Sequence, residues 1–203
     1  MILAVECSTA QGSVAVFDGT RCVACRESPT RMAGGMDAGA MMAAVFSDIG
    51  GAGAITQCAA GVGPGSFSGI RSVLGYLQGF CAPRGLPIIG IPGAAVCARA
   101  LAIDGTPMTA SIIGDARRGH YWRTDYRWDG SRLHETSPLR IIPYEKLSIV
   151  NGQLSTVYSP EPERIQAEGV ARVIPTAREV ALLALESPAL TAAPLPLYLH
   201  PAV

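Results

Sequence analysis

Short apolar runs separated by tight polar turns open the chain and predict strands. Ile2 to Val5 and Ser13 to Phe17 are two such runs with a polar turn between them. Asp18-Gly19 is a strong hairpin signal, and Arg21 to Arg26 is the returning segment. We therefore expect two consecutive hairpins, which form a three-stranded antiparallel meander.

Helical and strand-like patterns then alternate. Apolar residues recur at helical spacing over Met36 to Ile49, Gly69 to Ala82 and Ala94 to Ala102, and this period predicts three helices. The short apolar runs between them, Gln57 to Val62 and Pro87 to Ile91, are typical of buried parallel strands. A meander followed by strand, helix, strand and helix is the element order of an α/β fold of the ribonuclease H-like or actin-like ATPase type.

The pattern changes after residue 103, and we place a domain boundary there. Residues 1–103 are assigned to a first lobe with a mixed sheet and helices, and residues 104–203 to a smaller, more irregular second lobe. The elements expected in the second lobe are a hairpin of Thr109 to Asp115 with His120 to Trp128, short strands at Leu139 to Ile142 and Ser148 to Val150, and a helix at Thr176 to Leu185.

Composition and charge limit the cellular locations and the classes of binding partner that we expect for this chain. A hydrophobic content of 49% is enough to bury a sizeable core, and 16 basic residues balance 16 acidic ones, so no long-range field draws the whole chain to nucleic acid or an anionic membrane. The chain starts without a basic leader and has no run of about 18 apolar residues, so we expect a cytoplasmic protein with no membrane contact. The six cysteines are then expected to be reduced, and Cys22 and Cys25 have no second pair with which to hold zinc.

A glycine-rich turn over Gly61 to Gly69, here called the glycine loop, joins a predicted strand to a predicted helix. Its glycines permit close backbone approach, and Ser66 or Ser68 is placed to cap the helix, whose free N–H groups suit an anion. The phosphate-loop pattern requires a lysine that is absent, and the dinucleotide pattern requires a glycine where this loop has serine. By spacing alone, the loop is a structural turn, an anion site or a catalytic loop.

The residues of this loop carry a specific resemblance. Gly63 to Arg71 reads GPGSFSGIR, which resembles the GPGSFTGxR signature of the bacterial TsaB family, also called YeaZ, within the M22 or glycoprotease-like (Gcp-like) superfamily. Three more segments resemble family motifs: Leu3 to Thr9 is similar to LALDTST, Gly114 to Tyr121 to DARxxxVY, and Pro196 to Leu199 to PxYLR. Together the four segments span nearly the whole chain.

The resemblance implies two ribonuclease H-like lobes of the actin-like ATPase (ASKHA) fold and a role in making tRNA threonylcarbamoyladenosine. Members of the family are implied to be noncatalytic partners of the catalytic TsaD-like paralogue, working together with a TsaE-like ATPase. ATP then acts through the assembled complex, and tRNA is reached indirectly. The resemblance implies no cofactor and no catalytic residue for this chain.

The histidines agree with that implication. The catalytic paralogue is implied to hold a metal through an HxxxH pair on a helix, whereas this chain has only His120, His134 and His200, none of them paired at that spacing. We therefore expect no metal site, and an M22-type peptidase is the less favoured alternative. A Gly-x-Ser-x-Gly nucleophile motif is also absent.

A small ATP-dependent phosphotransferase of the actin-like fold is the main alternative function. Kinases of that fold use an N-terminal aspartate near the phosphates, and Glu6 stands at the corresponding position. The candidate residues of an anion or nucleotide site are therefore Glu6, Thr9, Gly63, Gly65 and Ser66.

The predicted helices offer a candidate partner surface. Gly75 and Gly79 form a stripe that costs about 1 kcal/mol per residue relative to alanine unless a neighbouring helix uses the space. The resemblance implies that the first two helices contact the catalytic paralogue, so the interface candidates are Met36, Ala40, Ala43, Gly75 and Gly79. Packing of the same helices within the chain is the alternative, and a homodimer is another use of such a surface.

The segment His120 to Trp128 mixes basic and aromatic residues, as RNA-binding grooves do. Strand alternation separates the two kinds: one face carries Trp122, Tyr126 and Trp128, and the other carries Tyr121, Arg123, Asp125 and Arg127. This separation favours a half-buried strand with a solvated charged face over direct RNA binding.

Overall fold

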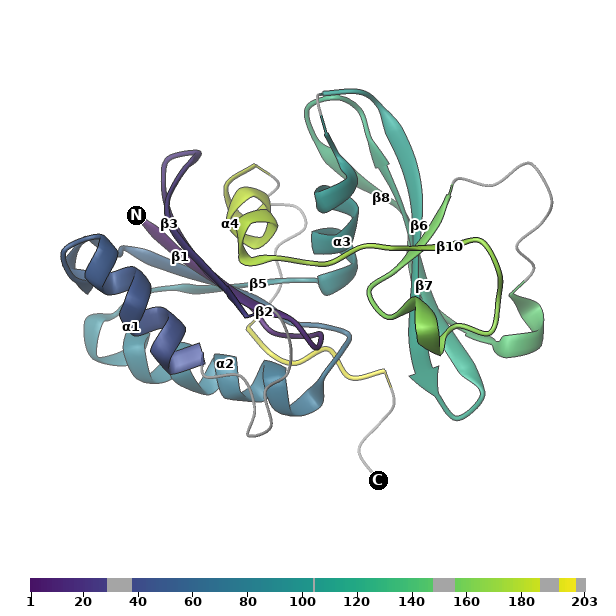
Figure 1. Cartoon of the computed structure of the whole chain (residues 1–203), viewed down its shortest axis with the longest axis horizontal. Helices are drawn as coiled ribbons and strands as arrows, with labels where there is room; N and C mark the ends of the chain where they lie inside the picture. Colours follow the sequence, from purple (N-terminus) through teal and green to yellow (C-terminus); the bar gives the residue numbers. More distant parts are fainter. Residues whose placement is uncertain (29–37, 104, 148–155, 187–193, 200–203) are drawn as a thin grey trace. The chain divides into compact units, whose positions relative to one another are not determined.

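The chain forms two compact units, seen here in a computed structural model (Figure 1). The described residues are 1–28, 38–103, 105–147, 156–186 and 194–199. The first unit combines Met1–Val96 with Pro175–Leu197, and the second combines Cys97–Ile174 with Tyr198–Val203. No helix among the described residues is long and apolar enough to cross a membrane.

The first unit is built on a five-stranded mixed sheet with the order β3-β2-β1-β4-β5. Its strands are β1 (Ile2–Glu6), β2 (Gly12–Asp18), β3 (Arg21–Ser28), β4 (Gln57–Gly61) and β5 (Ile88–Ile91). The pairs β1–β2 and β2–β3 are antiparallel, whereas β4 runs parallel to both β1 and β5. The predicted meander followed by parallel strands is therefore confirmed.

Helices cover both faces of this sheet (Figure 1). The helices α1 (Ala38–Asp48) and α2 (Phe67–Cys81) lie on one face, where Leu3, Val5 and Val14 belong to the same buried cluster as residues of both helices. The helix α4 (Ala177–Glu186) packs on β1 and β2 from the other side, and its first backbone N–H donates to the Ser13 hydroxyl at 2.8 Å. The unit therefore has three layers.

The division between the units differs from the predicted boundary at residue 103. It falls inside α3 (Gly93–Leu101), and the helix predicted at Thr176 to Leu185 returns to the first unit as α4 instead of belonging to the second lobe. A two-faced sheet needs apolar cover on both sides, and α4 supplies it with residues such as Val180 and Ala181, which are fully buried.

The second unit contains another five-stranded mixed sheet, with the order β10-β9-β6-β7-β8. Its strands are β6 (Met108–Arg117), β7 (His120–Trp128), β8 (Leu133–Pro143), β9 (Val157–Ser159) and β10 (Val170–Arg172). The predicted hairpin is confirmed as β6–β7. The strand expected at Leu139 to Ile142 is much longer, because β8 continues through Pro138 at an irregular point of its pairing with β7. The strand predicted at Ser148 to Val150 lies outside the described residues.

Single turns of 3-10 helix complete the described elements. They are η1 (Ala52–Ala54), η2 (Ala82–Arg84), η3 (Tyr144–Lys146) and η4 (Pro162–Arg164).

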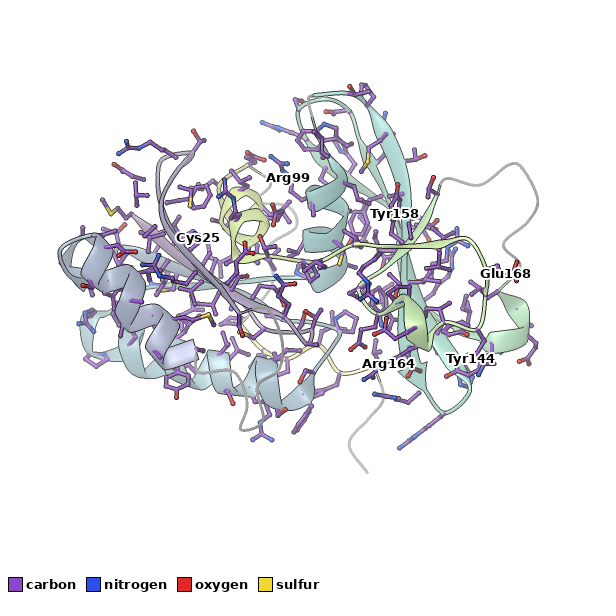
Figure 2. The ribbon with its side chains drawn as sticks, in the orientation of Figure 1. Cys25, Arg99, Tyr144, Tyr158, Arg164 and Glu168 are labelled. Carbon is purple, nitrogen blue, oxygen red and sulfur yellow. The ribbon has the colours of Figure 1, made fainter. Side chains whose placement is uncertain are left out.

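The two faces of the second sheet have different chemistry. Trp122, Tyr126 and Trp128 share the face toward α3, and the guanidinium of Arg99 on that helix lies 4.8 Å from the centre of the Trp128 ring. Figure 2 shows Tyr158 on this side of the sheet, whereas Tyr144 and Glu168 lie on the other side.

The expectation of a solvated face along β7 is wrong for Tyr121, which is 1% exposed. Its ring stacks on Tyr144 with centroids 4.2 Å apart, and its hydroxyl accepts the backbone N–H of Gln166 at 2.7 Å. Segments that follow β8 and β9 in sequence therefore cover this end of the face, which strand alternation could not foresee.

Candidate functional site

The glycine loop connects the end of β4 to the start of α2, as predicted. Ser66 is the N-cap of the helix, and its hydroxyl oxygen accepts the backbone N–H of Gly69 at 3.3 Å. Gly63 has a φ of 90°, a conformation that strongly favours glycine. The loop therefore has the strand-to-helix geometry in which anion sites are found.

The space inside the loop is filled by the chain itself. A side chain on Gly65 would overlap the Ser8 carbonyl oxygen, and one on Gly69 would overlap the Cys7 carbonyl oxygen. The backbone N–H of Ser66 donates to the same Ser8 carbonyl at 2.6 Å. These two glycines therefore permit close packing against the turn that follows β1, where a bound phosphate would otherwise approach.

Glu6, the last residue of β1, is fully buried beside this turn. Its Oε1 accepts the backbone N–H of Ser8 at 2.6 Å, whereas its Oε2 is buried with no hydrogen-bond partner among the described residues. Burial raises the pKa of Glu6, and the hydrogen bonds from Ser8 and Cys7 oppose that shift only in part. Burial also raises the pKa of the neighbouring Cys7 thiol. The structure thus gives Glu6 a setting that favours the neutral acid.

Thr9 and Gly63, two other residues predicted for this site, form hydrogen bonds within the chain. The Thr9 hydroxyl donates to the Gln11 carbonyl at 2.9 Å, inside the turn between β1 and β2. The Gly63 carbonyl accepts the backbone N–H of Gly93 at 2.7 Å, which ties the loop to the start of α3. The structure therefore brings Glu6, Gly65 and Ser66 together around one turn.

Sequence reasoning missed two residues that hold the loop in place. Gly93 lies against the backbone of Gly63, and the backbone N–H of Leu197 donates to the Val62 carbonyl at 2.8 Å. Leu197 belongs to the segment Pro196 to Leu199, which resembles a family motif. That resemblance was the only sequence signal that this distant segment has a structural role near the loop. The Gly93 contact, between backbone atoms, left no comparable signal.

The predicted helix surface is exposed. Ala40 and Ala43 of α1 and Gly75 and Gly79 of α2 all face solvent, whereas Met36 lies outside the described residues. A Cβ added to Gly75 or Gly79 would meet no atom within 4 Å. The two helices pack against each other elsewhere, where the rings of Phe46 and Phe80 stack 5.2 Å apart. The two helices therefore pack on each other within the chain, as the alternative from the sequence expected, but Gly75 and Gly79 take no part in that contact within the described residues.

The histidines take part in local contacts. His120 Nδ1 lies 2.8 Å from the Arg118 carbonyl oxygen, and His134 Nε2 lies 2.7 Å from Asp129 Oδ2, while His200 is not among the described residues. Within the described ranges, no group of three or more His, Cys, Asp or Glu side chains is arranged to hold a metal ion. The six cysteines form no disulfide.

Comparison with known proteins places these features in context. Residues 39–181 match the family described as TsaD, tRNA N6-adenosine threonylcarbamoyltransferase. The structure is similar to YeaZ from Pseudomonas aeruginosa, with a TM-score of 0.79 at 22% identity over 98% of this chain and 99% of that chain. It is also similar to an uncharacterized protein described as having similarity to peptidase YeaZ from Pseudomonas aeruginosa, with a TM-score of 0.75 at 23% identity over the same shares. No curated protein matches the chain.

These likenesses confirm the predicted fold. Both relatives are covered almost completely, so the likeness extends over both five-stranded mixed sheets and the helices described above. The chain therefore has two lobes of the ribonuclease H-like type, as its element order predicted.

Proposed function

The chain belongs to the family described as TsaD, tRNA N6-adenosine threonylcarbamoyltransferase, and from this membership we propose that it is a noncatalytic partner subunit of the complex that makes tRNA threonylcarbamoyladenosine. In this proposal it binds and supports a catalytic TsaD-like paralogue, and a TsaE-like ATPase joins the assembly. ATP acts through the complex, and no cofactor resides on this chain.

The packing of the glycine loop supports a structural role for it. In a phosphotransferase of this fold, the loop and the N-terminal acid would face the phosphates of a nucleotide. Here the backbone of Cys7 and Ser8 occupies the space beside Gly65 and Gly69, and Glu6 is fully buried. An acid that is shielded from solvent and favoured in its neutral form is poorly suited to organise a magnesium ion. The loop instead fixes the start of α2.

The observation that carries the proposal is the exposed surface of α1 and α2, here called the helix face and consisting of Ala40, Ala43, Gly75 and Gly79. Two glycines in the middle of a helix destabilise the isolated chain by about 1 kcal/mol each relative to alanine. Side chains this small let another helix approach with its axis at the short end of the usual 8–10 Å range. A partner helix that packs there offsets the intrinsic cost of the glycines.

Replacing the two glycines of the helix face with larger residues tests whether the partner binds there. We expect the paired variant Gly75→Leu with Gly79→Leu to fold, because both positions have open space around them, and to bind the TsaD-like paralogue at least 10-fold more weakly. Arg178→Leu is the matched control, since it adds one exposed leucine on α4, on the other face of the sheet. Isothermal calorimetry with the purified paralogue gives both affinities. Unchanged affinity in the paired variant would show that the partner binds elsewhere.

Analytical ultracentrifugation of the same variants distinguishes a homodimer from the complex. If two copies of the chain use the helix face for each other, the paired variant is monomeric by analytical ultracentrifugation and the wild type is not. We expect the paralogue to compete with such a dimer, because both would occupy the same four residues.

A further inference from the structure

A charged surface lies on the second sheet, on the side away from α3. It is called here the arginine face, and its members are Arg123, Asp125, Arg127 and Arg140; Ser111, which forms hydrogen bonds with two of them, is fully buried. In the sheet register, Ser111 stands opposite Asp125, and Arg123 stands opposite Arg140. The members therefore lie on the adjacent strands β7 and β8, beside the buried Ser111 of β6.

One carboxylate orients two guanidinium groups in this patch. Asp125 Oδ1 accepts the Ser111 hydroxyl at 2.6 Å and Arg123 Nε–H at 2.8 Å, and its Oδ2 accepts an Arg140 Nη2–H at 3.1 Å. Arg123 also donates from Nη2 to the Ser111 hydroxyl at 2.9 Å. Each guanidinium has five N–H donors, so both retain donors that the network does not use. The cluster is thus preorganised and carries a net positive charge.

Arg127 extends this positive charge along β7. It shares the face with Arg123, four residues away, which is about 13 Å along a strand. Its side chain is exposed and has no ion pair or hydrogen bond to the rest of the described chain. Between residues 108 and 143 the sequence holds six arginines and four carboxylates, although the whole chain is balanced at 16 of each sign. The excess is therefore local to these three strands.

The chemistry of the patch favours phosphate groups as its ligand. Guanidinium groups match the oxygens of a phosphate with paired donors, and arginine contacts to phosphates position nucleic acids without reading their sequence. The aromatic residues Trp122, Tyr126 and Trp128 are buried on the opposite face, so they are not available to stack on bases. A contact made here involves the backbone of a nucleic acid and not its bases.

We propose that the arginine face binds the phosphate backbone of RNA, so that this chain contacts the tRNA of the modification complex directly. The inference rests on the proposed function for the identity of the RNA. It rests on the geometry of Arg123, Asp125 and Arg140 for the chemistry of binding. In the segment His120 to Trp128, strand alternation places the two tryptophans on the opposite face, whereas the exposed Arg127 is open to phosphate contacts.

The test uses fluorescence anisotropy of a labelled tRNA titrated with the full chain, alone and in complex with the TsaD-like paralogue. The variant is Arg127→Gln with Arg140→Gln, because both side chains are exposed. The control is Arg21→Gln with Arg178→Gln, which removes the same charge from exposed positions of the first unit. Titrations at several salt concentrations give the slope of log K against log salt, and thermal unfolding checks that both variants fold.

We expect the variant to bind at least 10-fold more weakly than the control, with a salt slope smaller by about 2, or about 1 for each phosphate contact removed. A labelled RNA of unrelated sequence should show the same loss. Equal binding by variant and control overturns the proposal, as does wild-type chain that fails to bind RNA both alone and in the complex. Loss of paralogue binding in the variant with intact RNA binding also overturns it, and assigns the face to an acidic protein surface.

These outcomes are separate from a failure of the proposed function. Anisotropy with the lone chain reports RNA binding whether or not the chain supports modification. A chain that binds RNA through this face but does not affect modification refutes the proposed function and leaves the arginine face as an RNA-binding surface.

Discussion

The carboxyl group of Glu6 lies directly over the Cα of Gly61, so that a side chain at position 61 would overlap Glu6 Oε2. The two residues end the adjacent parallel strands β1 and β4. This contact explains why β4 ends in glycine. It also contributes to the burial of the Glu6 carboxyl group.

Gly61→Ala should destabilise the first unit. The added methyl group forces the buried Glu6 carboxyl to move, and overpacking of this kind costs about 1–3 kcal/mol. Urea unfolding monitored by circular dichroism measures the change. Gly53→Ala is the control, because a Cβ at Gly53 meets nothing within 4 Å. Equal stability of the two variants would contradict the contact.

The pH dependence of stability should carry the signature of Glu6. Burial raises the pKa of Glu6 in the folded chain above its ordinary value of about 4.3. The associated stability is fully present below the ordinary pKa, and it is lost as the pH rises through the folded pKa. Glu6→Gln keeps the shape and removes the ionisation. The stability of the wild type relative to this variant should therefore fall from pH 4 upward, measured by urea unfolding at each pH.

A difference between the two proteins that stays constant with pH would show that Glu6 does not change its pKa on folding. The comparison with Glu6→Gln removes the contribution of every other titrating group, because those groups are common to both proteins.

Gly75→Ala should stabilise the isolated chain. The residue lies inside α2, its surroundings are open, and alanine has a helix propensity about 1 kcal/mol better than that of glycine. Thermal unfolding of the isolated chain should show a higher Tm. A lower Tm would mean that the glycine has a packing role in the isolated chain.

Gly114→Ala should destabilise the second unit. A Cβ at this position on β6 would lie 2.5 Å from atoms of the Trp122 indole, which covers the glycine on the side of the sheet that faces α3. The expected loss is about 1–3 kcal/mol. Tryptophan fluorescence follows it selectively, because the two tryptophans, Trp122 and Trp128, both lie on β7. Gly119→Ala is not a suitable control, since Gly119 has a φ of 78°, so Thr136→Ala on the exposed part of β8 serves instead.

Much of the first unit could be predicted because its strands are distinct apolar runs and α2 has a clear helical period. The meander, the parallel strands and α2 follow from apolar runs and helical spacing, and the sequence offered Ser66 or Ser68 as the cap, of which the structure uses Ser66. The placement of α4 could not be predicted, because an amphipathic pattern shows that a helix has a buried face but not which sheet covers it. The three-residue strands β9 and β10 are too short to show a period.

The surroundings of the candidate site residues could not be predicted, and an anion or nucleotide site at these residues stays a prediction. The glycines of the loop indicated a close approach, and the approaching group is the backbone of Cys7 and Ser8, which no residue type in the pattern specifies. The burial of Glu6 is likewise a tertiary property, because the sequence places the acid at the end of a strand and cannot show what covers it. The exposure of Gly75 and Gly79 on α2 could not be predicted either, because two glycines four residues apart have the same sequence pattern whether they are packed or exposed.

The central proposal is that this chain supports threonylcarbamoyladenosine formation without catalysing it. It is tested most directly by measuring the rate of modified adenosine formation in tRNA, with the TsaD-like paralogue, the TsaE-like ATPase and this chain combined, and with each omitted in turn. We predict that this chain has no activity alone, and that omitting it reduces the rate of the complete mixture at least 10-fold. A rate that is unchanged when this chain is omitted would contradict the account, as would modification by this chain alone.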